Sequence, residues 1–239
     1  MRQAGLSAPP RFKDLAVRIG WSNTAQLVVA AKLPASVPRM SATRFPVHGP
    51  AALFVVLSGP SGAGKSTLMQ RFVERYPEFV RCLSVTTRPP RGTERDGVDY
   101  LLVGEEAFAE RVENNQLLEH AQVFGKHSYG TPRTFVDSHL AAGRSVIKDV
   151  DVQGAFTIRG TFPGALHIFV VPPDRVEIER RLRSRGTETE EAIRRRLNEA
   201  DRELGVWDRY DYLIINRDLD HAVDDLATIV AAERLRVRR

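Results

Sequence analysis

The sequence predicts an α/β fold in which helices flank a parallel sheet. An apolar strand pattern at residues 53–57 runs directly into a loop with the pattern Gly59-x-x-x-x-Gly64-Lys65-Ser66, and residues 66–73 then have the apolar spacing of a helix. Strand-like and helix-like segments alternate from Leu53 onward. This alternation is typical of a parallel sheet covered by helices.

Further strands and helices follow in order along the chain. Three apolar runs predict buried strands, at residues 145–150, 166–171 and 212–215. After the second run, Asp174 is placed as the N-cap of a helix that continues to Gly186. A last amphipathic helix is expected at about residues 220–237.

A second helix is predicted directly after Gly186. Thr187 and Glu190 have the spacing of a capping box. The apolar residues that follow recur at helical spacing and share one face: Ile193, Leu197, Ala200 and Leu204.

Charge is distributed unevenly over the 239 residues. The chain has 42% hydrophobic and 27% charged residues, which is ordinary for a globular protein, and a net charge of +5. Residues 1–50 hold seven Lys or Arg against one acid, a net charge of +6 that leaves −1 for the remaining 189 residues. The near-neutral body argues against a nucleic-acid-binding surface.

The first 50 residues contain six prolines and little sustained periodicity. We expect them to form a disordered N-terminal extension outside the fold. One explanation is a basic targeting segment, and a plainer one is that Met40 is the true start.

Cysteine content and hydropathy limit the compartment. Cys82 is the only cysteine, which excludes an internal disulfide and a Cys-rich metal site and fits a reducing, cytoplasmic environment. We expect it to be a small buried strand residue. No apolar run approaches the roughly 20 residues that cross a bilayer, so no membrane association is expected.

The glycine-rich loop carries the clearest chemistry. Gly59, Gly62 and Gly64 permit backbone conformations in which successive N–H groups converge on phosphate oxygens. Lys65 adds a positive charge, the following helix points its N-terminus at the same anion, and Ser66 is placed to bind Mg²⁺ through its hydroxyl. The loop therefore predicts a nucleoside triphosphate as phosphoryl donor and leaves the acceptor open.

Two further groups of polar residues suggest a second site. Arg88 and Arg91 flank a proline pair and could clamp an anion bidentately, although this fragment alone slightly favours an exposed basic turn. Asp149 and Asp151 stand two apart at the end of a predicted strand, so both are expected on one face at its carboxyl edge. Lys148 is unexpected in a buried strand.

Several motifs together resemble the guanylate kinase family over about residues 52–229. They are the loop at 58–67 and the segments at 84–91, 97–100, 118–121, 129–132, 149–154, 185–190 and 215–216. The turn before Tyr129 is one residue longer than is usual in the family, and Tyr129 is aligned through the Gly130-Thr131 that follows it.

The resemblance implies roles for individual residues. The phosphate of GMP would be bound by Arg88, Arg91, Tyr100 and Tyr129, and guanine would be read by Ser84, Glu119 and Asp151. Thr131 would also belong to the GMP site. ATP would lie on Gly59, Pro60, Ser61, Gly62, Ala63, Gly64, Lys65, Ser66 and Thr67, with Asn216 near adenine. Catalysis would involve Lys65, Asp149 and the lid arginines Arg185 and Arg196, with Ser66 and Asp149 near Mg²⁺.

The implied architecture is a P-loop NTPase-type sheet with a small α+β GMP-binding insertion and a helical lid. We expect a domain at 51–237, with its core at 51–83 and 132–237, the insertion at about 84–131 and the lid at about 184–198. The implied activity is ATP-dependent phosphorylation of GMP and dGMP. The alternatives are a ribose 1,5-bisphosphate kinase-like enzyme and a non-catalytic protein-binding module of the same fold.

Overall fold

The computed structural model describes residues 51–123, 126–184 and 189–236. Residues 1–50, 124–125, 185–188 and 237–239 lie outside this description. The expectations for the N-terminal extension, for Met40 and for the lid residue Arg185 therefore fall on undescribed residues.

A five-stranded parallel sheet forms the centre of the described chain, in the order β2-β7-β1-β8-β9. The predicted strands are confirmed in position, and the strand predicted at 145–150 ends one residue early, at Asp149. The strand at 212–215 is not buried as predicted, because it lies at the edge of the sheet and Leu213 and Ile215 are exposed. Val55 on the central strand β1 pairs with Ile147 on one side and Leu166 on the other. The strands are β1 (Phe54–Ser58), β2 (Phe79–Arg81), β7 (Ser145–Asp149), β8 (Leu166–Val171) and β9 (Tyr212–Ile215).

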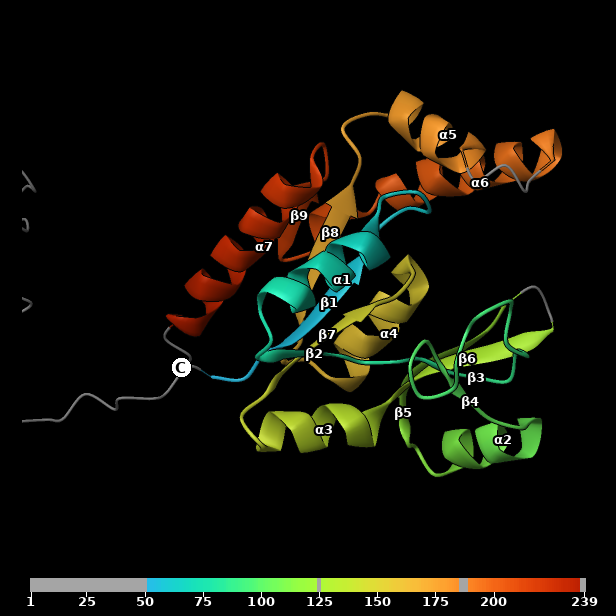
Figure 1. Cartoon of the computed structure of the whole chain (residues 1–239), viewed down its shortest axis with the longest axis vertical. Coiled ribbons are helices and arrows are strands. Elements are labelled where there is room, and N and C mark those ends of the chain that lie inside the picture. Colours follow the sequence, from blue (N-terminus) through green and yellow to red (C-terminus); the bar gives the residue numbers. More distant parts are fainter. Residues whose placement is uncertain (1–50, 124–125, 185–188, 237–239) are drawn as a thin grey trace, which may run out of the picture. The chain divides into compact units, whose positions relative to one another are not determined.

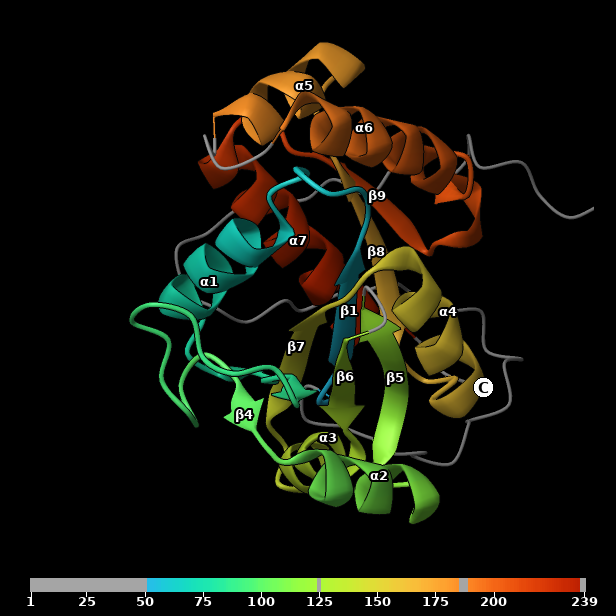
Figure 2. The ribbon, with the colours of Figure 1, turned by 90° about the vertical axis from the view of Figure 1, so that its right-hand side faces the viewer.

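Helices cover both faces of this sheet, as the sequence predicts (Figures 1 and 2). Val55 and Leu57 of β1 pack with α1 (Lys65–Arg75) and α7 (Leu219–Arg234), whereas Phe54 and Val56 pack with α3 (Arg133–Ala141) and α4 (Val152–Thr161). Because both faces of β1 are covered, all five of its residues are buried. The last helix ends three residues before the predicted end.

A smaller, mixed sheet lies in the chain between β2 and α3. Its order is β4-β3-β6-β5, with β3 and β4 parallel and the other pairs antiparallel. Val85, Phe108 and Leu117 form its apolar core against α2 (Glu105–Glu113). The strands are β3 (Val85–Thr86), β4 (Leu101–Leu102), β5 (Leu117–Val123) and β6 (His127–Pro132).

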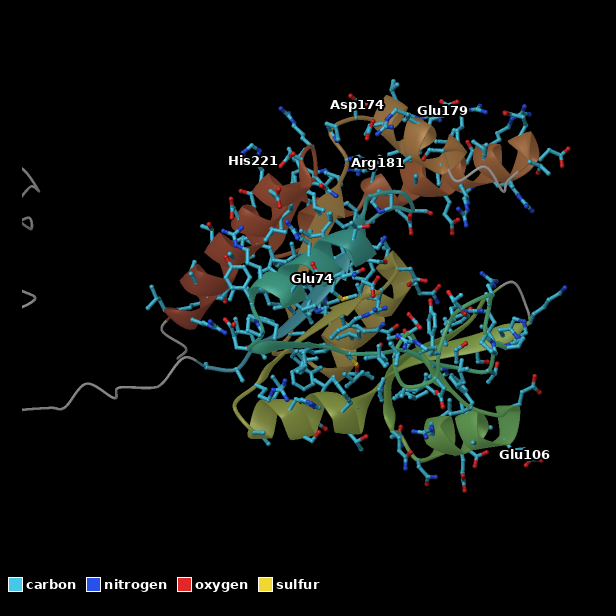
Figure 3. The ribbon with its side chains drawn as sticks, viewed as in Figure 1. Glu74, Glu106, Asp174, Glu179, Arg181 and His221 are labelled. Carbon is cyan, nitrogen blue, oxygen red and sulfur yellow. The ribbon has the colours of Figure 1, made fainter. Side chains whose placement is uncertain are left out.

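Two helices, α5 (Arg175–Arg183) and α6 (Glu190–Leu204), pack against each other through the face predicted from the sequence. Asp174 (marked in Figure 3) caps α5 as predicted, since its carboxylate accepts the N–H of Glu177 at 2.8 Å. The other two boundary predictions are wrong. Helix α5 ends at Arg183 rather than near Gly186, and Thr189 rather than Thr187 caps α6.

The cause of the second error is the pairing of Glu190. Its carboxylate binds the guanidinium of Arg183 across the two helices, so it does not complete a capping box. The hydroxyl of Thr189 accepts the N–H of Ala192 instead. A short 3₁₀ helix, Trp207–Arg209, then leads to β9. None of the described helices is long and apolar enough to cross a membrane.

Candidate active site

The glycine-rich loop joins β1 to α1 at the carboxyl edge of the central sheet. Gly59, Gly62 and Gly64 all have positive φ angles, of 137°, 86° and 87°. A Cβ on Gly59 would lie 2.1 Å from the carbonyl oxygen of Val170 in β8, so no larger residue fits there without displacing that strand. The predicted need for glycine is therefore confirmed, and the loop is seated on the sheet itself.

Side chains from distant parts of the chain brace this loop. Asn216 donates its amide N–H to the carbonyl of Ala63 at 2.8 Å, and Arg181 of α5 donates to the carbonyls of Asn216 and Ala63 at 3.0 and 3.3 Å. Figure 3 marks Arg181 on α5. Asn216, which the resemblance places near adenine, is thus buried against the loop backbone.

Lys65 lies folded over the loop that precedes it. Its ammonium group donates to the carbonyl oxygens of Gly59 at 2.6 Å and Pro60 at 3.1 Å. Ser66 and Thr67 follow in the first turn of α1, where both are exposed. A positive charge, two hydroxyls and the positive end of the helix therefore share one edge of the sheet.

Ser66 and Asp149 meet at this edge. The Ser66 hydroxyl donates to Asp149 Oδ2 at 2.7 Å, although the two residues are 83 positions apart. Burial would raise the pKa of Asp149, but the charges of Lys148, Arg81 and Lys65 together with the Ser66 hydrogen bond outweigh it and hold that pKa below its usual value. Asp149 is therefore an ionised carboxylate beside a hydroxyl, an oxygen pair of the kind that suits Mg²⁺.

Asp151 does not share a strand face with Asp149. It is the N-cap of α4, where its Oδ1 accepts the N–H of Gly154 at 2.6 Å. The expectation that both aspartates lie on one face of an extended strand is therefore wrong. The strand ends at Asp149, and the short link to α4 turns Asp151 toward the helix terminus.

Glu119, predicted on a strand, lies on β5 and is only 8% exposed. Thr131 of β6 donates its hydroxyl to Glu119 Oε1 at 2.6 Å. A Cβ on Gly154 would lie 3.2 Å from Asp151 Oδ1 and 3.3 Å from Glu119 Oε2, which shows that the two carboxylates meet at the start of α4. Burial raises the pKa of Glu119, while the Thr131 hydroxyl and the charge of Lys148 oppose this rise.

Three of the four residues expected around the acceptor phosphate are brought together. Arg88 is 4% exposed, donates to the Tyr129 hydroxyl at 2.9 Å, and its guanidinium carbon lies 5.1 Å from the centre of the Tyr100 ring. The interpretation of this segment as an exposed basic turn is thus wrong for Arg88. Tyr129 also pairs with Thr86 across β6 and β3, which fixes its place despite the longer turn before it.

Arg91, the fourth of these residues, is exposed. Glu94 links it to Arg88, because the Glu94 carboxylate accepts two bonds from the Arg88 guanidinium, at 2.8 and 2.9 Å, and one from the backbone N–H of Arg91 at 2.8 Å. The Arg88 guanidinium is therefore fully oriented within this cluster.

Ser84 and Lys148 connect the two sheets. Lys148, near the end of β7, is buried and donates from Nζ to Ser84 Oγ at 2.6 Å. Of the arginines on α6, Arg196 is half-buried and Arg194 and Arg195 are exposed. The second predicted lid arginine, Arg185, lies outside the described residues.

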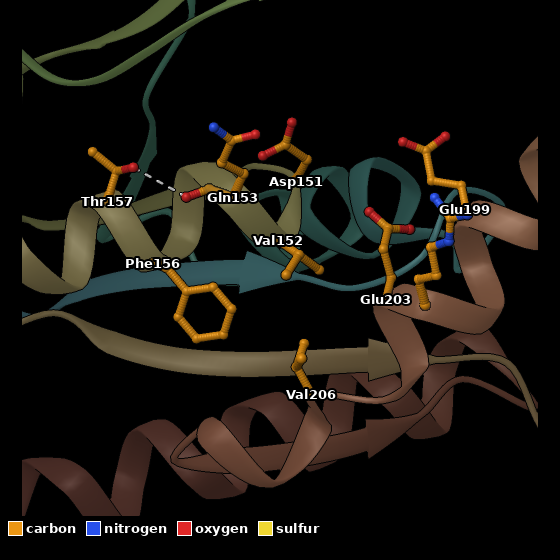
Figure 4. A pocket seen from close by; sticks show the side chains of 9 residues that line it. Asp151, Val152, Gln153, Phe156, Thr157, Glu199, Glu203 and Val206 are labelled. Carbon is orange, nitrogen blue, oxygen red and sulfur yellow. Dashed lines mark hydrogen bonds between the residues drawn. The ribbon is translucent and has the colours of Figure 1, made fainter.

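A cavity of about 610 Å³ opens between α4 and the end of α6 (Figure 4). Asp151, Glu199 and Glu203 contribute carboxylates to its wall, and Phe156 contributes an aromatic ring. Burial raises the pKa of Glu203 to about 7, against the opposing influence of Lys65 and the Ser61 N–H. The carboxylate of Glu203, at the end of α6, therefore interacts with the charge of Lys65 in the glycine-rich loop.

Four residues around the site were not identified from the sequence as functional: Glu94, Lys148, Arg181 and Glu203. Lys148 gave the only signal, a charge inside an apolar strand pattern. The others lie in helices or turns rich in charged residues, where one polar side chain does not stand out.

Comparison with known proteins identifies the family. The family model described as guanylate kinase matches residues 52–233. Proteins named guanylate kinase are 46% identical to the chain in Myxococcus xanthus and 45% identical in Escherichia coli K12, covering 80% and 77% of this chain and 91% and 89% of theirs. The relative from Desulfitobacterium hafniense is 44% identical and is covered over 94% of its length.

A solved structure agrees with these sequence matches. The crystal structure of guanylate kinase from Anaplasma phagocytophilum superimposes with a TM-score of 0.64 at 32% identity, covering 79% of this chain and 89% of that one. The residues matched by the family model, 52–233, include the loop, the smaller sheet and the helix pair described above. The chain belongs to the guanylate kinase family.

Proposed function

We propose that the loop at Gly59–Ser66 and the cluster around Glu119 are the two halves of one active site, the first for ATP and the second for GMP. The activity is that of a guanylate kinase, in which ATP phosphorylates GMP to give ADP and GDP in purine nucleotide metabolism. We extend it to dGMP, which carries the same base and the same phosphate.

The observation that carries this proposal is the buried Glu119–Thr131 pair. Guanine presents N1–H and N2–H₂ as donors on its Watson–Crick edge, and a carboxylate is an acceptor only. Adenine has no N1–H, so AMP would leave the buried Glu119 carboxylate unpaired, which is the strongest basis for rejecting a substrate analogue. Asp151, whose carboxylate meets that of Glu119 at the start of α4, is assigned to the guanine amino group.

The phosphate of GMP is assigned to the cluster of Arg88, Arg91, Tyr100 and Tyr129. Two guanidinium groups and two phenolic hydroxyls supply enough donors for a dianion. The Glu94 carboxylate binds the same guanidinium of Arg88 and would therefore compete with the phosphate for its donors. Thr131 and Ser84 complete the pocket beside Glu119.

Transfer begins when an oxygen of the GMP phosphate attacks the γ-phosphorus of ATP, and the bond to the β–γ bridging oxygen breaks to release ADP. The protein supplies position and positive charge rather than covalent chemistry. The loop N–H groups and Lys65 hold the triphosphate, while Arg196 and Arg185 approach as the helix pair closes. Closure excludes water, which would otherwise compete with GMP as acceptor.

Mg²⁺ fits the pair formed by Ser66 and Asp149. A hydroxyl and an ionised carboxylate 2.7 Å apart beside the loop are the hard oxygen donors that this ion uses together with substrate phosphates and water. Bound there, the ion would neutralise charge on the β- and γ-phosphates. Asp149 would act through a water molecule, and Ser66 directly.

The two rival functions are disfavoured by particular residues. A ribose 1,5-bisphosphate kinase would have no use for the buried Glu119, and a non-catalytic module would not need the loop with Lys65 or the Ser66–Asp149 pair. Cys82 is buried as predicted, but it directly follows β2 instead of lying in a strand. Burial raises its pKa to about 12, which fits a structural thiol in a reducing cytoplasm.

Two variants separate the halves of the site. Glu119→Gln should reduce kcat/KM for GMP by roughly 100-fold or more and leave the KM for ATP unchanged, because one acceptor oxygen becomes a donor facing donors. Glu106→Gln, an exposed residue of α2 marked in Figure 3, is the matched control. Lys65→Ala should instead remove turnover with every acceptor. Equal losses for GMP and ATP in Glu119→Gln would contradict the assignment.

A further inference from the structure

Lys148 is a buried cation, and neither the glycine-rich loop nor the phosphate cluster makes use of it. It lies on β7 with only 3% of the residue exposed, opposite Val56 of β1. Val56 and Val146, which share its face of the sheet, belong to the apolar cluster under α3 and α4. An ammonium group at this position costs free energy unless its donors are matched by acceptors.

The acceptor that Lys148 reaches is the hydroxyl of Ser84. The distance from Nζ to Ser84 Oγ is 2.6 Å, whereas the distance from Nζ to the carboxylate oxygen Asp149 Oδ1 is 3.9 Å. Ser84 is 64 positions away in the sequence and precedes β3 of the smaller sheet. The contact therefore ties the end of a central strand to the pocket assigned to guanine.

The chemistry of this contact fixes the direction of the Ser84 hydroxyl. An ammonium group can only donate, so Ser84 Oγ must act as its acceptor. The hydroxyl proton then points away from Lys148 and is offered as a donor to another group. Donation from a cation also makes that hydroxyl a stronger donor, since hydrogen bonds in a chain polarise one another.

On the guanine edge the remaining acceptor is O6. Glu119 can pair only with the N1–H and N2–H₂ donors, which leaves O6 to be matched by a protein donor. Adenine carries an amino group at the same position, and an amino group facing a fixed donor would be rejected.

We propose that Lys148 is a specificity-determining positioning residue, which holds the Ser84 hydroxyl as a donor toward the O6 atom of guanine. This inference rests on the proposed GMP site. It makes Lys148 act through Ser84 rather than by touching the substrate. This role explains why a lysine interrupts the apolar pattern of β7 at position 148: it contributes to recognition of the 6-oxo group of guanine.

The test measures steady-state kinetics of the full chain with GMP and with 6-thio-GMP, in which sulfur, a weaker acceptor, replaces O6. Lys148→Met has a similar length without the charge, and Arg144→Met removes one exposed positive charge just before the same strand as a control. Lys148→Met should raise the KM for GMP about tenfold, the effect of losing roughly one hydrogen bond, with the KM for ATP unchanged.

The preference of the wild-type protein for GMP over 6-thio-GMP should fall toward unity in Lys148→Met and in Ser84→Ala. The double variant should match Ser84→Ala alone, because both changes remove the same contact. If Lys148→Met does not fold, Lys148→Leu, which also carries no donor, is measured for the same loss of preference.

An unchanged preference for GMP over 6-thio-GMP in the Lys148 variant, or additive losses in the double variant, would overturn the inference. Failure of the wild-type protein to phosphorylate GMP would instead overturn the proposed function on which it rests.

Discussion

Thr131→Val removes one hydroxyl from the buried pair that we assign to guanine recognition and leaves the shape of the side chain nearly unchanged. Thr131 is fully buried, and its hydroxyl donates to Glu119 Oε1 at 2.6 Å. A hydrogen bond to a charged group contributes about 1.5–3 kcal/mol, so its loss should reduce kcat/KM for GMP by roughly 10- to 150-fold.

The pKa of Glu119 determines how the loss of kcat/KM in Thr131→Val depends on pH. Burial already raises the pKa of Glu119, and the Thr131 hydroxyl opposes that rise. Without the hydroxyl the pKa rises further, so the ionised carboxylate that accepts from guanine is lost at a higher pH than in the wild type. The loss of kcat/KM for GMP should therefore be larger at pH 6 than at pH 9.

A coupled assay of ADP release, run over this pH range with GMP and ATP varied in turn, measures the effect. Thr228→Val is the matched control, because Thr228 is exposed on α7 and its hydroxyl bonds only a carbonyl of its own helix. The KM for ATP should be the same in all three proteins. If Thr131→Val had the wild-type kcat/KM for GMP at every pH, the assignment of Glu119 to guanine would be refuted.

Three further perturbations test the loop, the Mg²⁺ pair and the cavity. Gly59→Ala should lower the free energy of unfolding by about 3 kcal/mol or more and the melting temperature by roughly 6–12 °C, because its Cβ would meet the Val170 carbonyl. Gly160→Ala, with open space around it, should not destabilise the protein. Equal melting temperatures for the two variants would contradict the contact between the loop and β8. Asp149→Asn should raise the Mg²⁺ concentration for half-maximal activity by about 10- to 100-fold, and an unchanged Mg²⁺ titration would remove Asp149 from the metal site. The pKa of Glu203 is raised from 4.5 to about 7, so the wild-type protein loses stability as the pH rises through that interval. Glu203→Gln should therefore have a higher melting temperature than the wild type at pH 8 and a similar one at pH 4. Parallel plots of melting temperature against pH would show that the residue does not titrate with a raised pKa.

Strands β1, β7 and β8 of the central sheet were predictable because they are buried on both faces, whereas the three-residue edge strand β2 was not identified from the sequence. Apolar runs such as residues 166–171 have no alternative place in a protein of this size, and the glycine-rich loop fixes where the first strand ends. The two-residue strands β3 and β4 were not predictable as strands. They are too short to show a period, and they exist because pairing with β6 and with each other holds them.

The predicted end of a helix or strand was wrong where two residues of similar chemistry could each occupy the boundary position. Thr187 and Thr189 are both good N-caps, and the choice between them depends on Glu190 pairing with Arg183 across the helix pair. Asp151 was placed on the strand because a spacing of two suggests one face, whereas the strand stops at Asp149. In the first case the deciding contact is tertiary and leaves no local trace in the sequence, whereas in the second it is the local N-cap bond from the Gly154 N–H to Asp151.

The candidate site shows the same division. The residue types of the loop and the Ser66–Asp149 pairing follow from known motif chemistry, because the carboxyl ends of adjacent parallel strands meet at one edge. The bond from Lys148 to Ser84 joins the two sheets, and the bonds from Arg88 to Glu94 depend on how one irregular segment folds back on itself. Side-chain partners of this kind emerge only from the folded structure.

The central claim is that this protein transfers phosphate from ATP to GMP and reads the guanine edge with Glu119. Its most direct test is the rate of ADP formation by the purified wild-type protein with ATP and Mg²⁺ and one acceptor at a time: GMP, dGMP, AMP or ribose 1,5-bisphosphate. We predict rapid turnover with GMP and dGMP, and a kcat/KM for AMP lower by a factor on the order of 10⁴. Equal turnover of AMP and GMP, or preference for ribose 1,5-bisphosphate, would contradict it.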